Sequence, residues 1–274
     1  ARASGCPVEV VNAGVHGYST DQEALWYARE AEPLGADVVL VFAYYNDILN
    51  NIRVNYWGSP KPLTKVTDGR IVPVNLPLPE PSRTAESQGI QTKARPAIEG
   101  SALRQVLLER IVLGAPKLHG WLARIGVLDP IVAEAVPDEL RAYKSRGQLG
   151  EFDEAWESTR ALFGALGEII RARNARPVLV YIPARFEISR RDWDLTVQRY
   201  GLEEKAWDRT RVRTRLKDIA TPAGWDFLDL TPSLEAATSP LRGETYLPYD
   251  GHWNPRGHDV AARAVVAYLR ERNL

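Results

Sequence analysis

The pattern of hydrophobic and polar positions divides the chain into two blocks in which predicted strands and helices alternate. In the first block, residues 8–14 (VEVVNAG) form a short β-branched run that ends in turn residues, which is typical of a strand entering a loop. Residues 19–34 open with N-capping side chains and continue with helix formers, and residues 35–47 contain an uninterrupted apolar run. Because such an apolar strand is typical of a sheet covered on both faces, the block predicts strand, helix and strand in a parallel α/β arrangement.

The second block runs from about residue 150 to residue 274 and repeats this texture. Its pattern predicts strands at residues 176–185 and 225–232, and helices at residues 153–175, 203–224 and 254–274. Strands and helices that alternate in this way form βαβ units. We therefore expect the two blocks to share one mainly parallel sheet.

Residues 51–150 separate the two blocks and read as an insertion. The first half is rich in Pro, Gly and Ser and has no sustained period, whereas helical patterns follow in the second half. Long irregular segments of compact domains are either functional covers or passive excursions, so a lid over a site and a passive loop are both open. The prediction is a single domain over residues 1–274, interrupted by this insertion.

Composition and charge narrow the function classes. The 274 residues are 45% hydrophobic, and 35 basic residues balance 35 acidic ones, so no electrostatic case exists for nucleic acid or an anionic membrane surface. The single cysteine, Cys6, excludes an intramolecular disulfide and a thiolate metal site. No stretch approaches a membrane span, and no signal pattern is visible. Because the sequence contains no methionine, we expect a segment upstream of residue 1 to have been removed.

Candidate chemistry lies in the loops that follow the predicted strands, where open α/β sheets place their sites. Asp250 and His252 suit an orienting carboxylate and a general base, because the carboxylate fixes the imidazole tautomer and stabilises the imidazolium. Asn46 offers a side-chain donor and Gly17 a backbone donor, and paired donors are what an oxyanion requires. An Asn-Asp pair after a strand is also a common turn or helix cap, so each element alone is a weak indication.

Three segments together resemble the SGNH (GDSL-like) hydrolase superfamily: NAGVHGYST at residues 12–20, YYNDI at 44–48 and DGHWNPRGHDVAA at 250–262. They match its second, third and fifth sequence blocks in order, and the resemblance covers about residues 8–50 and 174–272. It implies a three-layer α/β/α sandwich of the flavodoxin-like SGNH type. It also implies ester hydrolysis or acyl transfer through a serine acyl-enzyme, without metal or organic cofactor. In this resemblance Gly17 and Asn46 match the oxyanion hole, His252 the base and Asp250 its partner.

The sequence departs from the family pattern at three points. Asp250 precedes His252 by two positions rather than three, which resembles the branch containing alginate O-acetyltransferases and favours a carbohydrate ester as substrate. Tyr44 stands where family members often have glycine. The Gly-Asp-Ser motif that carries the nucleophile is absent, and no strand precedes Val8 to hold it. We therefore expect the first strand and its serine to lie in a segment upstream of residue 1.

Other residues and functions stay open at this stage. Ser19 is an alternative nucleophile, although it stands where a helix N-cap is expected, and Arg185 could bind an anionic group or form a surface salt bridge. A rival function is an inactive SGNH-like module that binds a glycan or a protein partner. A further alternative is a metal hydrolase built on Asp250, His252 and Asp47. Analogy with carbohydrate esterases favours the cell envelope or secretion, and the sequence does not fix the oligomeric state.

Overall fold

A three-stranded parallel sheet forms the centre of the protein in a computed structural model. The structure describes residues 8–56, 58–80, 135–145, 150–238, 244–247 and 251–274. The strands β1 (Val38–Ala43), β6 (Arg176–Tyr181) and β7 (Asp226–Asp229) lie in the order β1-β6-β7. All three lie within segments predicted as strands, and both neighbouring pairs are parallel. The sheet thus joins the two sequence blocks, as the pattern predicts.

The strand register divides the side chains between two cores. Val39 and Val41 of β1 pair with Pro177 and Leu179 of β6, and Val41 and Leu179 belong to the larger buried cluster. The alternate residue Val178 of β6 belongs to the smaller cluster on the other face. Since successive side chains of a strand point to opposite faces, this alternation shows that the sheet is covered on both sides.

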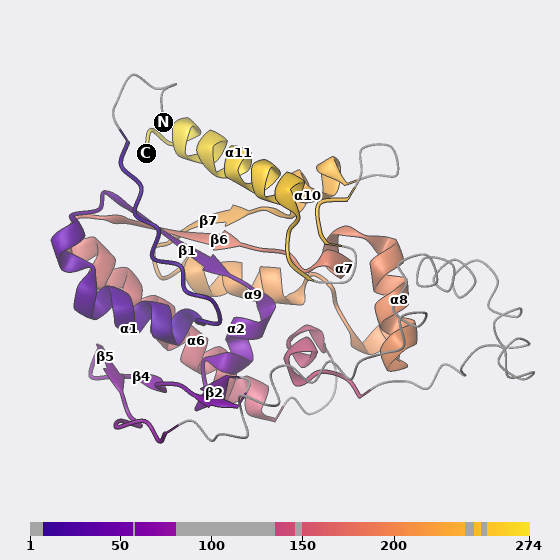
Figure 1. Cartoon of the computed structure of the whole chain (residues 1–274), viewed down its shortest axis with the longest axis horizontal. Helices are drawn as coiled ribbons and strands as arrows, with labels where there is room; N and C mark the ends of the chain where they lie inside the picture. The colour runs from indigo at the N-terminus through magenta and orange to yellow at the C-terminus, as the bar shows by residue number, and fades with distance from the viewer. Residues whose placement is uncertain (1–7, 57, 81–134, 146–149, 239–243, 248–250) are drawn as a thin grey trace, which may run out of the picture.

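Helices form the two outer layers (Figure 1). On one face α1 (Thr20–Glu30), α6 (Glu151–Ala172) and α9 (Arg211–Ala220) supply the larger core. On the other face α10 (Thr231–Ala237) and α11 (Pro255–Glu271) cover the smaller core. The result is the predicted three-layer α/β/α arrangement, and it is consistent with an SGNH-like fold.

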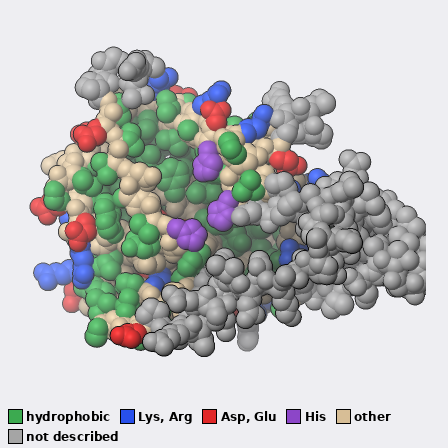
Figure 2. Space-filling view, in the orientation of Figure 1, with side chains coloured by type: hydrophobic (Ala, Val, Ile, Leu, Met, Phe, Trp, Pro, Cys, Tyr) green, Lys and Arg blue, Asp and Glu red, His purple; other side chains and the backbone are tan. Residues whose placement is uncertain are grey.

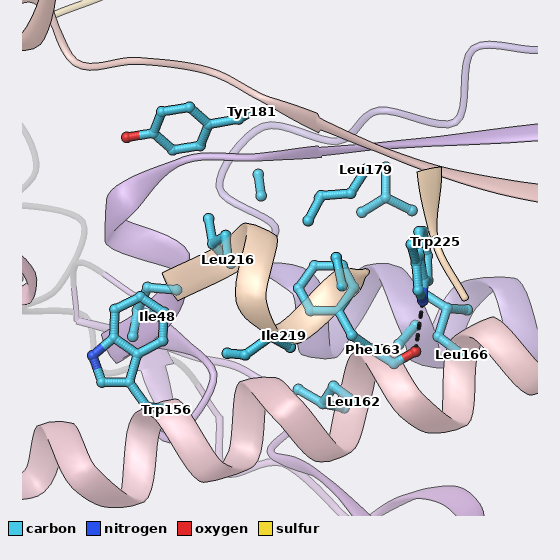
Figure 3. Close-up of a cluster of buried hydrophobic side chains, with 14 of the residues drawn as sticks. Ile48, Trp156, Leu162, Phe163, Leu166, Leu179, Tyr181, Leu216, Ile219 and Trp225 are labelled. Carbon is cyan, nitrogen blue, oxygen red and sulfur yellow. Dashed lines mark hydrogen bonds between the residues drawn. The ribbon is translucent and has the colours of Figure 1, made fainter. Parts of the chain in front are cut away.

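The larger core is packed mainly with aromatic and aliphatic side chains of α6 and α9 (Figure 3). The buried ring of Phe163 meets that of Trp225 edge to face, with ring centroids 5.1 Å apart. The Trp225 indole N–H donates to the Phe163 carbonyl over 2.9 Å, which satisfies the polar atom of a buried tryptophan. These contacts hold α6 against Trp225, the residue just before β7.

Short helices begin just after the strands, at the carboxyl edge of the sheet. Helix α2 (Tyr45–Asn50) follows β1, α7 (Arg185–Ile188) and α8 (Arg190–Tyr200) follow β6, and α10 follows β7. The sequence pattern predicted loops after β1 and β6. The structure shortens both, because only Tyr44 separates β1 from α2 and only residues 182–184 separate β6 from α7. Candidate residues of those segments are therefore held on helical first turns rather than on open loops.

The predicted strand at residues 8–14 is wrong for the described structure. These residues have no regular secondary structure, and the side chains of Val8, Val10 and Val11 are exposed. A strand needs a hydrogen-bonded neighbour, and within the described residues no strand pairs with this segment. One edge of β1 is likewise unpaired within the described residues.

The first part of the insertion forms two small hairpins that pack on the domain. Strands β2 (Asn55–Tyr56) and β3 (Ser59–Pro60) form one antiparallel pair, and β4 (Thr64–Thr67) and β5 (Arg70–Pro73) form the other. Strand β4 lies against α6 and α1. Residues 81–134 and 146–149 lie outside the described residues, so the predicted helices and lid of that part stay predictions.

The remaining regular elements of the described residues are short 3-10 helices. They are η1 (Glu32–Leu34), η2 (Asp138–Tyr143) and η3 (Glu204–Ala206). The segment with η2 lies beside α2 and α9, and its Tyr143 is fully buried. Within the described residues, no helix has the length and apolar character needed to cross a bilayer.

Candidate active site

A hairpin-like turn just before α11 carries His252. Tyr246 and Trp253 form an antiparallel bridge across it, and the Leu247 amide donates to the His252 carbonyl over 2.9 Å. The Asn254 amide donates to the Thr245 carbonyl over 3.0 Å. These contacts define the His252 hairpin, residues 244–247 and 251–254, in which the histidine is exposed.

Helix α11 and the His252 hairpin are joined by an N-cap and a close backbone contact. The Asn254 side chain accepts from the Gly257 amide over 3.0 Å and donates to the Glu244 carbonyl over 2.9 Å. A Cβ atom on Gly257 would lie 2.1 Å from the Thr245 carbonyl oxygen, so glycine is required for this approach. The sequence Asn-Pro-Arg-Gly thus both starts α11 and seats the hairpin.

The same hairpin is anchored to the loop that follows β6. The buried Tyr246 hydroxyl donates a short hydrogen bond to the Pro183 carbonyl. Arg185 donates to the Leu247 carbonyl over 3.2 Å and forms ion pairs with Asp192 at 3.0 Å and Glu244 at 3.6 Å. Arg185 therefore links the His252 hairpin to Asp192 of α8, and only 18% of its side chain is exposed. These ion pairs favour the salt-bridge interpretation of Arg185 over anion binding.

Contact with the carboxyl end of β1 brings the hairpin to Asn46. A Cβ atom built on Gly251 would lie 3.4 Å from the Tyr44 hydroxyl oxygen, so this phenol reaches the hairpin next to His252. Asn46 lies two residues beyond Tyr44, in the first turn of α2. The structure therefore brings the segments of His252 and Asn46 to the same edge of the sheet.

Gly17 packs against Tyr56 of β2, and the Tyr56 phenol interacts electrostatically with Asp47, the residue after Asn46. The φ of Gly17, +79°, lies in the left-handed region, and a Cβ atom there would lie 2.7 Å from the Tyr56 ring. Burial raises the pKa of Tyr56, and the Asp47 carboxylate, beside Asn46, raises it further. Both the backbone conformation and the ring contact require glycine at this position.

The face that carries these residues is notably apolar (Figure 2). Histidine side chains gather near its middle beside a broad hydrophobic area, and the histidines among the described residues are His16, His252 and His258. His258 packs edge to face against Trp253, with ring centroids 5.5 Å apart. Large hydrophobic side chains of the segment before α1 and of β1 are exposed, among them Val10, Val15 and Phe42.

Asp47 has a structural task in α2. Its carboxylate accepts from the Tyr44 amide over 2.8 Å, which is the cap expected of an Asn-Asp pair after a strand. Burial raises its pKa to about 7, although the Tyr44 hydrogen bond acts in the opposite direction. Asp47 is therefore a buried side chain that caps the start of α2.

Ser19 is buried in a polar network rather than open to a substrate. Its side chain is 1% exposed and does not cap α1; the hydroxyl donates to Asp21 over 2.7 Å. The Lys61 ammonium donates to the Ser19 hydroxyl at 3.0 Å, to Asp21 at 2.8 Å and to the Asn50 carbonyl at 2.7 Å. Asn51 accepts from the Asp21 amide and donates to Thr159 of α6. This network ties α1, the hairpin insertion and α6 together.

Sequence reasoning missed a second buried network at the end of β6. One oxygen of Glu187 accepts from the hydroxyls of Tyr143 and Tyr181, each over 2.6 Å, and from the Ala184 amide over 2.7 Å. The only signal was the three-residue spacing from Ala184 to Glu187 after a strand, which is common at helix starts.

The described residues contain no group of three or more histidine, cysteine, aspartate or glutamate side chains that could hold a metal ion. Asp250, a member of the metal-hydrolase alternative and of the predicted catalytic pair, lies outside the described residues. The two other members of that alternative, His252 and Asp47, lie on the hairpin and inside the capped turn of α2. The described geometry thus gives the metal alternative no support.

The fold is consistent with an SGNH-like arrangement, and one comparison with known families gave a match. Residues 143–274 match the family described as ALGX: SGNH hydrolase-like domain, acetyltransferase AlgX. This match confirms the resemblance to the SGNH and O-acyltransferase superfamily over the segment that contains β6, β7, the hairpin and α11. It fits a family of O-acyltransferases and esterases. Gly17 and Asn46 lie outside the matched residues, and comparison with curated proteins and with solved structures gave no significant match.

Proposed function

We propose that the protein is an O-acyltransferase or esterase that acts on carbohydrate O-acyl esters through a serine acyl-enzyme. The observation that carries this proposal is the position of the His252 hairpin. It lies within the matched segment and meets the carboxyl end of β1 at Tyr44, two residues before Asn46. A general base and an oxyanion donor at the same sheet edge are the parts that acyl transfer needs.

In the proposed reaction His252 is the general base. It accepts the proton of a serine hydroxyl while the serine oxygen bonds to the acyl carbon, and it then gives that proton to the departing alcohol. An acceptor hydroxyl, from water or a sugar, next loses its proton to His252 and attacks the acyl-enzyme. The serine leaves and takes the proton back from His252. Asp250, two residues before His252, is proposed to orient the imidazole.

Gly17 and Asn46 are proposed to form the oxyanion hole. The backbone N–H of Gly17 and the side-chain amide of Asn46 would both donate to the negative oxygen of the tetrahedral intermediate. Two structural features support this assignment. The left-handed backbone of Gly17 is fixed against Tyr56, and Asn46 is held on the capped first turn of α2.

The nucleophilic serine is proposed to lie on a strand that pairs with the open edge of β1. Within the described residues, that edge has no neighbour, and the segment 8–15, which has no regular secondary structure, exposes Val8, Val10, Val11 and Val15. A parallel strand placed there would end at the same edge as Asn46, where its last residue could reach His252. Ser19 does not suit the role, because its hydroxyl is committed to Asp21 and Lys61 inside the domain.

Release of acetate from an O-acetylated polysaccharide by the intact protein, and transfer of acetyl to an unacetylated oligosaccharide, test this function. His252→Ala should abolish both, while His258→Ala, which removes an imidazole of the same face, should retain them. If both variants keep full activity, the assignment of the base is wrong. If the intact protein binds the glycan without acyl chemistry, the rival binding module replaces the enzyme.

A further inference from the structure

The Glu187 carboxyl group has no task in the proposed reaction, yet it binds the turn to which the His252 hairpin is anchored. It is a buried acid in an aromatic environment: the ring of its neighbour Phe186 lies 5.0 Å from that of Tyr143 and 5.8 Å from that of Trp193, centroid to centroid. Burying a carboxyl group is costly unless donors surround it. Here its three donors come from the η2 segment, from β6 and from the start of α7.

These donors fix the short segment that leaves β6. Tyr181 is the last residue of the strand, and Ala184 is the residue before α7, so Glu187 binds both ends of the Tyr181–Ala184 turn. The Pro183 carbonyl inside this turn accepts the hydroxyl of Tyr246. Movement of the turn must therefore move the anchor of the His252 hairpin.

Hydrogen bonds continue from that anchor to the histidine. Tyr246 bridges Trp253, the residue after His252, and the next residue, Leu247, donates its amide to the His252 carbonyl. A continuous path thus runs from Glu187 through the Pro183 carbonyl and Tyr246 to the backbone of His252. Each step is either a hydrogen bond, a bridge or the covalent bond between neighbouring residues, as between Pro183 and Ala184 and between Tyr246 and Leu247.

We infer that Glu187 is a positioning residue that sets the placement of His252 through the Tyr181–Ala184 turn and Tyr246. This inference rests on the proposed role of His252 and deepens it. Glu187 touches neither the acyl group nor the reacting atoms. It acts by fixing the backbone that carries the base.

The charge of Glu187 changes in the neutral range, which makes the coupling measurable. Burial raises the pKa of Glu187 to about 7, and the hydrogen bonds from Tyr143, Tyr181 and Ala184 oppose this rise. The groups that face the carboxyl from the elements packed around it are Tyr45 of α2, Tyr143 of η2, Tyr181 of β6, Arg213 of α9 and Tyr246 of the hairpin. Ionisation places a negative charge among four phenols and one guanidinium, so the hydrogen bonds to the turn must tighten or shift.

The test follows the backbone amide of Leu247 by NMR as a function of pH, in a His252→Ala background that removes the titration of the histidine itself. The inference predicts a shift of this amide with a midpoint near the pKa of Glu187, about 7. Adding Glu187→Gln, which keeps an acceptor oxygen but carries no charge, should remove that shift. Adding Glu235→Gln instead, an exposed carboxyl on α10, should leave it in place.

Tyr181→Phe gives a second, independent variant. Loss of one donor to the carboxylate should move the Leu247 midpoint to higher pH, because that hydrogen bond favours the ionised form of Glu187. A Leu247 shift that is unchanged by both Glu187→Gln and Tyr181→Phe would overturn the inference.

Activity separates the inference from the proposed function. In the otherwise unmodified protein, Glu187→Gln should lower kcat at neutral pH with little change in KM and should remove one inflection of the pH profile. If the intact protein neither hydrolyses nor transfers acyl groups, but the shift of the Leu247 amide still depends on Glu187, the proposed function is wrong and the coupling between Glu187 and the hairpin stands. If activity requires His252 but the chemical shift of the Leu247 amide does not depend on Glu187, the inference is wrong and the proposed function stands.

Discussion

Lys61 is the residue whose role is least visible in the sequence. It lies in the Pro-rich stretch SPKPL, where nothing indicates burial, yet its side chain is 4% exposed and donates three hydrogen bonds. Its partner Asp21 is fully buried on the first turn of α1. Burial raises the pKa of Asp21 and lowers that of Lys61, while their mutual attraction opposes both changes. The pair is thus costly to bury but more costly to break.

Lys61→Met should lower the free energy of unfolding by about 3–5 kcal/mol, because it leaves the Asp21 carboxylate buried without a cation. Adding Asp21→Asn should recover part of this loss, since no isolated charge then remains. Lys65 is an exposed lysine on β4, so Lys65→Met should change the free energy of unfolding by less than about 0.5 kcal/mol. Chemical denaturation checks all three. A loss below about 1 kcal/mol for Lys61→Met would contradict the structural role of the pair.

Asn46 should contribute to the reaction without contributing to binding. As a proposed oxyanion donor it acts on charge that develops only in the transition state, so Asn46→Ala should lower kcat by about 100- to 1000-fold with little change in KM. Steady-state kinetics on an acetyl ester measure this. Asn55→Ala, an exposed residue of β2, is the control and should leave kcat unchanged. A change confined to KM would mean that Asn46 only binds the substrate.

The candidate residues could be proposed from the sequence because they stand in short motifs. The buried polar side chains that hold their segments in place could not be predicted. Gly17, Asn46 and His252 lie on segments that the structure brings to one sheet edge, although catalytic roles for them stay proposals. Ser19 illustrates the limit. Its N-cap position was readable, but its hydroxyl binds Asp21 and Lys61, partners that depend on where a distant hairpin packs. Side chains that meet only through tertiary contacts leave no local pattern.

Helix α11 and the His252 hairpin behave as one unit. The close contact at Gly257 lets the first turn of the helix press against the backbone and the Trp253 side chain of the hairpin. The predicted helix at residues 254–274 begins one residue before α11 and ends three residues after it, and its start was predictable because a cap and a proline coincide there. The segment 8–14 was predicted just as firmly and is not a strand. A β-branched run shows that a segment can pair, but pairing needs a neighbouring edge.

Gly257→Ala should disrupt the contact between α11 and the His252 hairpin. The added methyl group would lie 2.1 Å from the Thr245 carbonyl and 2.9 Å from the Trp253 Cβ atom, so the hairpin or the helix must move. We expect a loss of about 1–3 kcal/mol in stability, together with reduced activity. Gly164→Ala in α6 is the matched control, because its Cβ would meet no atom within 4 Å, and it should stabilise the helix by up to about 1 kcal/mol. Thermal unfolding of both variants decides; equal midpoints would contradict the contact.

At the scale of the whole molecule, helices cover both faces of the sheet, and within the described residues the outer edges of β1 and β7 have no strand partner. All three strands of this sheet lie within segments that the sequence predicted as strands, because short apolar runs bounded by turn signals identify buried strands well. The buried acids were not predictable, because their pKa values depend on the assembled interior. Asp47 and Glu187 both have pKa values raised to about 7, mainly by burial.

These raised values predict how stability depends on pH. A carboxyl whose pKa is higher in the folded state stabilises the fold below its unfolded pKa, and the contribution is lost as pH rises through the folded pKa. The free energy of unfolding should therefore fall between about pH 5 and 8. For Glu187 a rise from 4.5 to about 7 corresponds to roughly 3 kcal/mol. Urea denaturation across this range should show a smaller fall in Glu187→Gln than in Glu235→Gln; equal slopes would contradict the burial of the charge.

Labelling of the intact protein with a fluorophosphonate probe, followed by mass spectrometry of the labelled peptide, tests the central claim most directly. The account predicts one labelled serine on a strand that pairs with β1, with labelling lost in His252→Ala and kept in His258→Ala. A label on Ser19, or no label on folded protein that still binds a glycan, would contradict it.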